Sequence, residues 1–257
     1  MYTLNINNGI TFSAASIIGQ REQQQDFYTC SRLADRTIAI VCDGMGGMAG
    51  GSIASRHAAN LLLQDLENVS PTEDMYSFFK RELEKLDDAI FGLKDEKGAR
   101  LGAGTTIVAV LMFGNKLYWF SVGDSKLYYM RKQEFYCVTR SHNYAMQLED
   151  MRKNSCIDEK QYIEESKKGE QLISYLGMGM AEIFDGNYSP FMMEVGDKIL
   201  LCTDGLYRTL NQHEIKKILE ERGNTEYKCK AFENAILSKK NLSQDNATWI
   251  VIQKIGE

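Results

Sequence analysis

The sequence has few of the residues that separate domains or bind soft metals. Only two prolines, Pro71 and Pro190, occur in 257 residues, and no glycine- and serine-rich linker is present. Composition therefore marks no domain boundary, and we expect a single domain over 1–257. The three histidines and six scattered cysteines show no zinc-knuckle or redox spacing, which favours reduced thiols.

An excess of positive charge and long apolar runs are also missing. The formal net charge is -5, and no block of Lys and Arg with interleaved aromatics occurs, so we expect no nucleic-acid partner. The longest apolar run, 107–113, is too short to cross a bilayer, and the N-terminus lacks a secretory-signal pattern. We therefore expect a cytoplasmic protein with no membrane partner, and we expect it to be a monomer.

Strand-like runs rich in β-branched and aromatic residues follow one another through tight turns such as Gly114-Asn115. Helical periodicity is confined to separate stretches, with Thr72 and Asn211 as expected N-caps. This order predicts antiparallel strands and an α+β layered sandwich. The expected strands are 37–42, 105–113, 116–122, 126–130, 134–138, 198–202 and 247–253, and the expected helices are 52–66, 72–93, 211–222 and 226–238.

One long segment, 141–176, lies between two expected strands and is polar, weakly periodic and rich in Lys and Glu. Long segments of this kind inside a domain are usually functional. We therefore expect a mobile or partly helical, flap-like insertion beside the site, which gates access or selects substrates.

Four apolar strand-like segments share one feature: each ends or begins at an aspartate beside a small residue. They are AIVCDGMGG, WFSVGDSK, ILLCTDGL and SQDNATWIV, which supply Asp43, Asp124, Asp204 and Asp245. A single such aspartate is ordinarily a turn residue, since Asp-Gly and Asp-Asn are frequent after strands. Four together indicate more, because ionised carboxylates at the ends of buried strands need pairing or a cation.

The cation that such carboxylates would share is a hard one. All-oxygen ligation favours Mg²⁺ or Mn²⁺ over zinc, and no His or Cys cluster accompanies the aspartates. His213 precedes Glu214 but no second histidine follows, so the metalloprotease pattern is incomplete. The sequence therefore predicts a centre of magnesium or manganese ions.

Six motifs occur in one order over nearly the whole chain: REQQQD (21–26), DGMGGMAGG (43–51), GAGTT (102–106), VGDSKLY (122–128), CTDGL (202–206) and DNAT (245–248). Together they resemble the metal-dependent type 2C serine/threonine protein phosphatases, in particular the stand-alone bacterial catalytic domains. The resemblance implies a four-layer α+β sandwich of two antiparallel β-sheets flanked by α-helices.

The resemblance also implies a metal-ligand set. Asp43 would bridge two Mn²⁺ or Mg²⁺ ions, and the Gly44 carbonyl would ligate one of them. Asp204 and Asp245 would complete the shell of the first ion. Asp26 would hold an ion-bound water or ligate weakly.

Further roles follow from the same resemblance. Asp124 would support a third, more loosely held ion, and Arg21 would bind the substrate phosphate, so that Arg21 and Asp43 are the expected catalytic residues. The implied substrates are phosphoserine and phosphothreonine in proteins, and the implied partner is a cognate serine/threonine kinase. Two ions that share a carboxylate can activate a bridging water, so no protein nucleophile is required.

Two positions depart from the family pattern. Met45 stands where many relatives carry a histidine and cannot donate a proton, and Gln25 stands where Asn or Glu is usual. The alternative is therefore a pseudophosphatase that binds phosphoproteins or a kinase without turnover. Retention of Asp43, Asp204 and Asp245 favours the enzyme.

A dinucleotide fingerprint is a weaker alternative. Gly44, Gly46 and Ala49 follow a strand with the spacing of a G-x-G-x-x-A motif. The next strand-like run does not begin until 105, so no compact βαβ unit closes there, and the motif match carries little weight.

Overall fold

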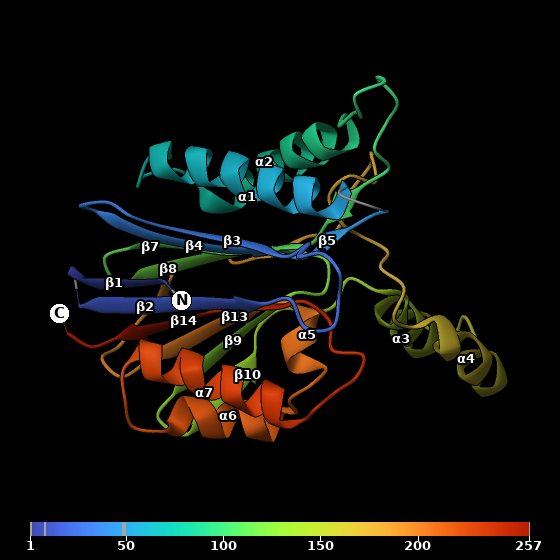
Figure 1. Ribbon diagram of the computed structural model, residues 1–257. Helices are drawn as coiled ribbons and strands as arrows, with labels where there is room; N and C mark the ends of the chain where they lie inside the picture. The colour runs from blue at the N-terminus through green and yellow to red at the C-terminus, as the bar shows by residue number, and fades with distance from the viewer. Residues whose placement is uncertain (1, 8, 48–49, 257) are drawn as a thin grey trace.

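Two antiparallel β-sheets lie face to face at the centre of the fold (Figure 1). The computed structural model describes residues 2–7, 9–47 and 50–256. The first sheet has the order β1-β2-β14-β13-β9-β10 and the second has β11-β8-β7-β4-β3 with β12 beside β8, while β5 and β6 pair separately. The strands are β1 Tyr2–Asn7, β2 Ile10–Ile17, β3 Phe27–Arg32, β4 Arg36–Cys42, β5 Gly44–Met45, β6 Gly104–Thr105, β7 Ile107–Phe113, β8 Lys116–Val122, β9 Lys126–Arg131, β10 Glu134–Cys137, β11 Asp185–Gly186, β12 Phe191–Met192, β13 Lys198–Cys202 and β14 Ala247–Lys254.

The central strands are unbroken apolar runs because both of their faces are covered. In β4, Ile40 packs with the helices on the outer face, whereas Val41 packs into the layer between the sheets. Strand β14 repeats the pattern, with Trp249 toward its helices and Ile250 between the sheets. Successive side chains of a strand point to opposite faces, so a strand in the middle of a layered fold needs apolar residues at every position.

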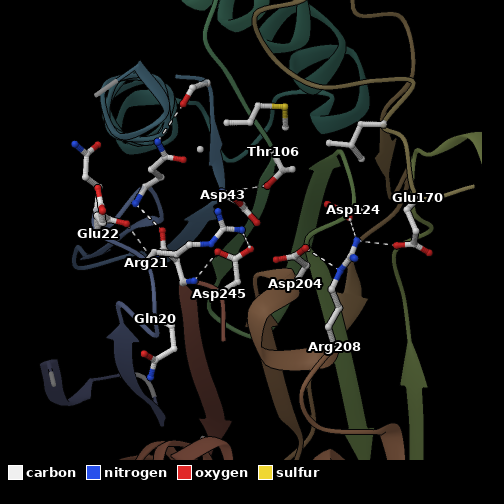
Figure 2. Close-up of a pocket in the computed structure, with 17 residues that line it drawn as sticks. Gln20, Arg21, Glu22, Asp43, Thr106, Asp124, Glu170, Asp204, Arg208 and Asp245 are labelled. Atoms are coloured by element: carbon white, nitrogen blue, oxygen red, sulfur yellow. Dashed lines mark hydrogen bonds and ion pairs between the residues drawn. The ribbon is translucent and has the colours of Figure 1, made fainter. Parts of the chain in front are cut away.

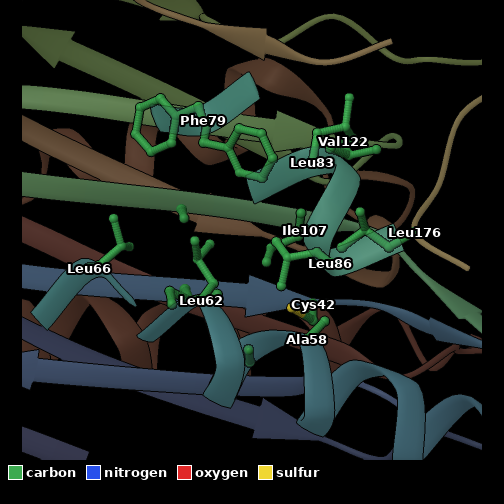
Figure 3. Close-up of a cluster of buried hydrophobic side chains, with 14 of the residues drawn as sticks. Cys42, Ala58, Leu62, Leu66, Phe79, Leu83, Leu86, Ile107, Val122 and Leu176 are labelled. Carbon is green, nitrogen blue, oxygen red and sulfur yellow. The ribbon is translucent and has the colours of Figure 1, made fainter. Parts of the chain in front are cut away.

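Helices cover the outer face of each sheet and complete four layers (Figure 1). Helices α1 (Gly50–Asn68) and α2 (Met75–Phe91) lie on the second sheet, where Leu62 and Leu86 enter a fully buried cluster (Figure 3). On the first sheet, the cover consists of α6 (Gln212–Glu220) and α7 (Thr225–Ser238). The layers are those predicted from the motifs.

The segment 141–176 contains α3 (Tyr144–Lys153), α4 (Glu159–Glu165) and a 3₁₀ turn (Ser166–Lys168). These helices project from the end of the sandwich where β5 and α5 (Asp204–Tyr207) lie (Figure 1). The expectation of a partly helical segment at this place agrees with the structure.

Both ends of the 141–176 segment are hydrogen-bonded to residues next to core strands. The buried His142 donates its backbone N–H to the Gly123 carbonyl at 3.0 Å, and its Nδ1 accepts from the Gly123 N–H at 3.1 Å. At the C-terminal end of the segment, Leu176 and Thr105 exchange two backbone hydrogen bonds of 2.9 Å. The projecting helices therefore start and finish at fixed points beside the loops that carry Asp124 and Asp43.

Several local predictions can be checked. The two-residue turn at Gly114-Asn115 is confirmed, because Phe113 pairs with Lys116 across it. Asn211 caps α6 as expected, but Thr72 as a cap was wrong. Helix α2 begins at Met75, since the Asp74 carboxylate accepts the Ser77 N–H, and a carboxylate at this position also suits the helix dipole.

The dinucleotide interpretation finds no support in the topology. Strand β7, the first long strand after α1 and α2, pairs antiparallel with β4, so no parallel crossover forms. Met48 and Ala49 of the glycine-rich motif lie outside the described residues. The six cysteines are free. Within the described ranges, no helix combines the length and apolar character needed to span a membrane.

Candidate metal-binding site

The four strand-end aspartates line one cavity of about 970 Å³ (Figure 2). Asp43 follows β4, Asp124 lies between β8 and β9, Asp204 begins α5 after β13, and Asp245 precedes β14. The cavity is also lined by the predicted site residues Arg21 and Gly44. Residues up to 224 positions apart in sequence thus come together at one edge of the sandwich.

Asp43 is positioned by the threonine pair of the GAGTT motif. Its backbone N–H donates to Thr106 Oγ1 at 3.1 Å, and its carbonyl accepts from the Thr106 N–H and from Thr105 Oγ1, each at 2.9 Å. Thr106 Oγ1 is 2.7 Å from Ser125 Oγ, in the loop that carries Asp124. This hydroxyl network fixes two carboxylate-bearing loops relative to each other, which explains why small hydroxyl residues stand beside both aspartates.

The glycine of each Asp-Gly pair is required by close packing rather than by a turn. A Cβ on Gly44 would lie 2.1 Å from the Gly51 carbonyl oxygen, and one on Gly205 would lie 1.9 Å from the Asn246 carbonyl oxygen. Gly44 belongs to β5 and Gly205 to α5. The ordinary turn interpretation of these dipeptides therefore does not describe them.

Asp26 lies behind the cavity and is absent from its described lining. It is 6% exposed and accepts a hydrogen bond of 2.8 Å from Thr203 Oγ1. Burial raises the pKa of Asp26 to about 7, with hydrogen bonds from Thr203 and Thr248 opposing the shift. The position suits an outer role better than direct ligation.

Burial and crowding of like charges disfavour ionisation at the centre of the site. Burial first, and then the charges of Asp26 and Asp204, raise the pKa of Asp43 well above its usual range. Burial also raises the pKa of Asp204 to about 6, although the Arg208 guanidinium opposes it. Carboxylates gathered in this way are stabilised in their charged form by a bound cation.

Two arginines supply positive charge inside the cavity (Figure 2). Arg21 Nη2 lies 2.6 Å from Asp245 Oδ2. Arg208 Nε lies 2.8 Å from Asp204 Oδ2, and its Nη2 lies 2.7 Å from the Glu170 carboxylate. Each guanidinium group is thus paired with a carboxylate that the sequence assigns to an ion: Arg21 with Asp245 and Arg208 with Asp204. Arg208 is also paired with Glu170, which belongs to the 141–176 segment.

The donor set is that of a hard divalent cation, because it consists of carboxylates and a backbone carbonyl. In the part of the chain that the structure describes, no group of three or more His, Cys, Asp or Glu side chains is arranged to hold a metal ion. Three of the four carboxylates instead lie within ion-pair distance of an arginine: Asp245 of Arg21, and Asp204 and Asp124 of Arg208. These contacts use Oδ2 of each carboxylate, so an ion at Asp204 or Asp245 would share the carboxylate with its arginine or displace the arginine.

The two residues that depart from the family pattern have defined places. Met45 lines the cavity and has no proton to donate. Gln25 donates its side-chain amide to the Gly46 carbonyl at 3.1 Å, and its backbone N–H donates to Asn246 Oδ1 at 2.8 Å. Gln25 thus holds the glycine-rich segment to the loop before β14, a role that needs an amide rather than a charge.

Several cavity residues received no role from the sequence, among them Glu170, Arg208 and Asn246. A signal existed for Arg208, which lies four positions after Asp204 at the end of a short helix and therefore on the same side. Asn246 follows a predicted ligand directly. Nothing in the sequence distinguishes Glu170 from the other acidic residues of its segment.

A family model described as "Protein phosphatase 2C" matches residues 15–243. Among curated relatives, "Serine/threonine phosphatase stp" of Listeria welshimeri is 26% identical over 226 residues, which cover 86% of this chain and 85% of that protein. The residues matched by the family model include five of the six motifs found above, and DNAT (245–248) lies just beyond them. The resemblance to the type 2C protein phosphatases is confirmed.

Solved structures carry the same fold. The serine/threonine phosphatase of S. agalactiae matches with a TM-score of 0.80 at 23% identity, covering 96% of this chain and 100% of that one. The catalytic domain of serine/threonine protein phosphatase PstP, described in complex with two manganese ions, matches with a TM-score of 0.73 at 23% identity, covering 96% and 99%. The predicted α+β sandwich is confirmed.

Proposed function

The chain belongs to the protein phosphatase 2C family, and from this membership we propose that it hydrolyses phosphoserine and phosphothreonine in proteins at a centre of two Mn²⁺ or Mg²⁺ ions. The observation that carries the proposal is the convergence of Asp43, Asp124, Asp204 and Asp245 on one cavity. The name of the related PstP domain, with two manganese ions, supports the ion number.

The residues that would hold the ions are Asp43, the Gly44 carbonyl, Asp204 and Asp245, with Asp26 behind them. When bound, the ions supply Lewis-acid activation of a water for attack on phosphorus. The chain contributes the geometry: the hydroxyls of Thr105 and Thr106 fix the Asp43 backbone, so its carboxylate is presented from a rigid strand end.

The substrate phosphate would be oriented by Arg21, which lines the cavity with its side chain 60% exposed. A planar guanidinium can contact two phosphoryl oxygens at once and offset the charge that they carry. Asp245, its present partner, would then be free to engage an ion. Met45 supplies no proton, so protonation of the leaving alcohol falls to another group of the cavity.

Phosphorylated proteins are the proposed substrates, and a serine/threonine kinase is the proposed opposing enzyme, by analogy with the names of the relatives. A single domain over 1–257, a monomeric state and a cytoplasmic location stay predictions from the sequence. The pseudophosphatase remains the second candidate, favoured by one observation: arginines are paired with Asp204 and Asp245.

Hydrolysis of para-nitrophenyl phosphate and of a phosphothreonine peptide tests the proposal. The purified chain should release phosphate with Mn²⁺ or Mg²⁺, and chelator or Asp43→Asn should abolish the release. Asp35→Asn, at an exposed carboxylate outside the cavity, is the matched control. A chain that binds Mn²⁺ and phosphopeptide but releases no phosphate would instead be a pseudophosphatase.

A further inference from the structure

Arg208 lies among three carboxylates that come from three parts of the chain (Figure 2). Its Nε is 2.8 Å from Asp204 Oδ2, and its Nη2 is 2.7 Å from Glu170 Oε2 and 3.7 Å from Asp124 Oδ2. Asp124 Oδ2 also accepts a hydrogen bond of 3.1 Å from the Tyr207 hydroxyl. One guanidinium group therefore offsets part of the negative charge between Asp124 and Asp204 and lies in the space between them.

This is the position in which Asp124 would have to support an additional ion. Asp124 is only 6% exposed, and its carboxylate already contacts the Tyr207 hydroxyl and the Arg208 guanidinium. A divalent ion placed there would face the Arg208 charge at close range, and a guanidinium cannot lose its proton to relieve the repulsion. Asp124 and Asp204 thus have a permanent cation of their own.

Glu170 holds this cation in place from the opposite side. It lies in the 141–176 segment, close to the point where Tyr144 N–H bonds the Gln171 carbonyl at 2.8 Å and closes the base of the projecting helices. The Glu170 side chain is 75% exposed, and that of Arg208 is 45% exposed. Their pair is thus an exposed contact that positions Arg208 but adds little to stability.

We infer that Arg208 is a positioning residue that takes the place of a third divalent ion between Asp124 and Asp204, and that Glu170 holds it there. The inference rests on the proposed two-ion function. It predicts that this chain binds one ion fewer than a variant in which the guanidinium is removed. It is an alternative to the sequence expectation that Asp124 supports a loosely held third ion, and the ion count decides between the two.

Counting bound Mn²⁺ by equilibrium dialysis and metal analysis tests the inference without any turnover. Arg208→Gln should bind one more Mn²⁺ per chain at saturation than the wild type. Arg208→Lys keeps the positive charge and should bind the wild-type number. Arg222→Gln, which removes an exposed arginine outside the cavity, is the matched control and should also match the wild type.

Glu170→Gln separates the role of the segment from that of the cation itself. With its holding partner lost, Arg208 should yield to the additional ion at high Mn²⁺ concentration, so that the extra binding event is weaker than in Arg208→Gln but present. Glu164→Gln, at an exposed glutamate in α4, should leave the ion count unchanged.

The outcomes distinguish this inference from the proposed function. Equal ion counts in wild type and Arg208→Gln would overturn the inference, even if the wild type hydrolyses phosphopeptide. One extra ion in Arg208→Gln would support it, even if neither protein releases phosphate and the proposed function fails. A structural role for Arg208 alone would lower the melting temperature without adding an ion.

Discussion

Arg21 Nη2 lies 2.6 Å from Asp245 Oδ2, so the arginine assigned to the substrate phosphate is paired with a carboxylate assigned to an ion. The two side chains are 60% and 37% exposed. Exposed pairs of this kind contribute only about 0 to 1 kcal/mol. The pair can therefore open at little cost when an ion binds Asp245 and a phosphate is offered to Arg21.

Replacing Arg21 should separate these two roles. In Arg21→Gln, Asp245 loses its competing partner, so Mn²⁺ should bind up to about five-fold more tightly, the factor that ~1 kcal/mol allows. The KM for a phosphothreonine peptide should rise, because the bidentate phosphate contact is lost. Calorimetric Mn²⁺ titration and steady-state kinetics measure the two effects.

Arg21→Lys gives the matching control, since it keeps the charge but not the planar fork. It should restore Mn²⁺ affinity toward the wild-type value while leaving KM raised. An unchanged KM in both variants would show that Arg21 serves Asp245 alone.

Asp43 lies where burial and neighbouring carboxylates make its ionised form unfavourable in the absence of a bound cation. Burial and the charges of Asp26 and Asp204 raise its pKa, so an ionised Asp43 destabilises the fold at pH 8 unless a cation is present. Asp43→Asn should therefore melt at the same or a higher temperature than wild type in chelator. Mn²⁺ should raise the melting temperature of the wild type but not of the variant, as scanning calorimetry can measure.

The convergence of the aspartates could be predicted because strand register brings strand ends together. Cys42 pairs with Phe27 and Cys202 with Trp249, so the residues just beyond these pairs meet at one edge. The sequence contains the apolar runs and the carboxylates that end them. The sequence does not show how deeply each carboxylate is buried, and the structure places Asp26 behind the cavity, next to Thr203. That Asp26 holds an ion-bound water or ligates weakly stays a prediction.

Strand β2 was not predicted, because its burial depends on partners distant in sequence. Strand β2 carries serines that would ordinarily indicate an exposed loop. Ser13 Oγ lies 2.8 Å from Thr225 Oγ1, and Ser16 Oγ lies 2.7 Å from Thr248 Oγ1. The first pair permits the burial of Ser13, whereas Ser16 remains exposed, and only the tertiary fold brings these hydroxyls together. The Arg208–Glu170 pair could not be predicted for the same reason, because its two residues are distant in sequence and only the tertiary fold brings them together.

Glu82 predicts a pH dependence of stability that is independent of the cavity. It is 6% exposed, and burial, with a hydrogen bond and charge from Asp65, raises its pKa from 4.5 to about 7, against the opposing charges of Lys85 and Arg81. A raised pKa means that its contribution to stability is complete below pH 4.5 and is lost as pH rises through 7. The largest loss is about 3 kcal/mol.

Glu82→Gln should remove this loss, because the amide resembles the protonated acid and does not titrate. The unfolding free energy of the variant relative to wild type should increase from pH 4.5 to pH 8, as urea unfolding at a series of pH values can measure. Glu84→Gln, at an exposed position of the same helix, should follow the wild type. A constant difference for Glu82→Gln would contradict the raised pKa.

Asp87 holds the chain that leads out of the 141–176 segment. Its Oδ1 accepts the Gly177 N–H at 2.6 Å and the Met178 N–H at 3.0 Å, and its Oδ2 accepts the Ala181 N–H at 3.0 Å. Asp87 is only 3% exposed, so its oxygens depend on these backbone N–H groups rather than on water. A buried acceptor that receives three hydrogen bonds is expensive to lose.

Asp87→Asn keeps the shape but turns one oxygen into a donor that faces backbone N–H groups. We expect a loss of about 2 to 3 kcal/mol in the free energy of unfolding, with faster amide exchange at 177–181. Because Leu176 pairs with Thr105, and Thr105 Oγ1 donates to the Asp43 carbonyl, hydrolysis should also fall. Asp88→Asn, one residue on and exposed, should change neither. If Asp87→Asn kept full stability and slow exchange, the loop would be held by the packing of its side chains rather than by this carboxylate.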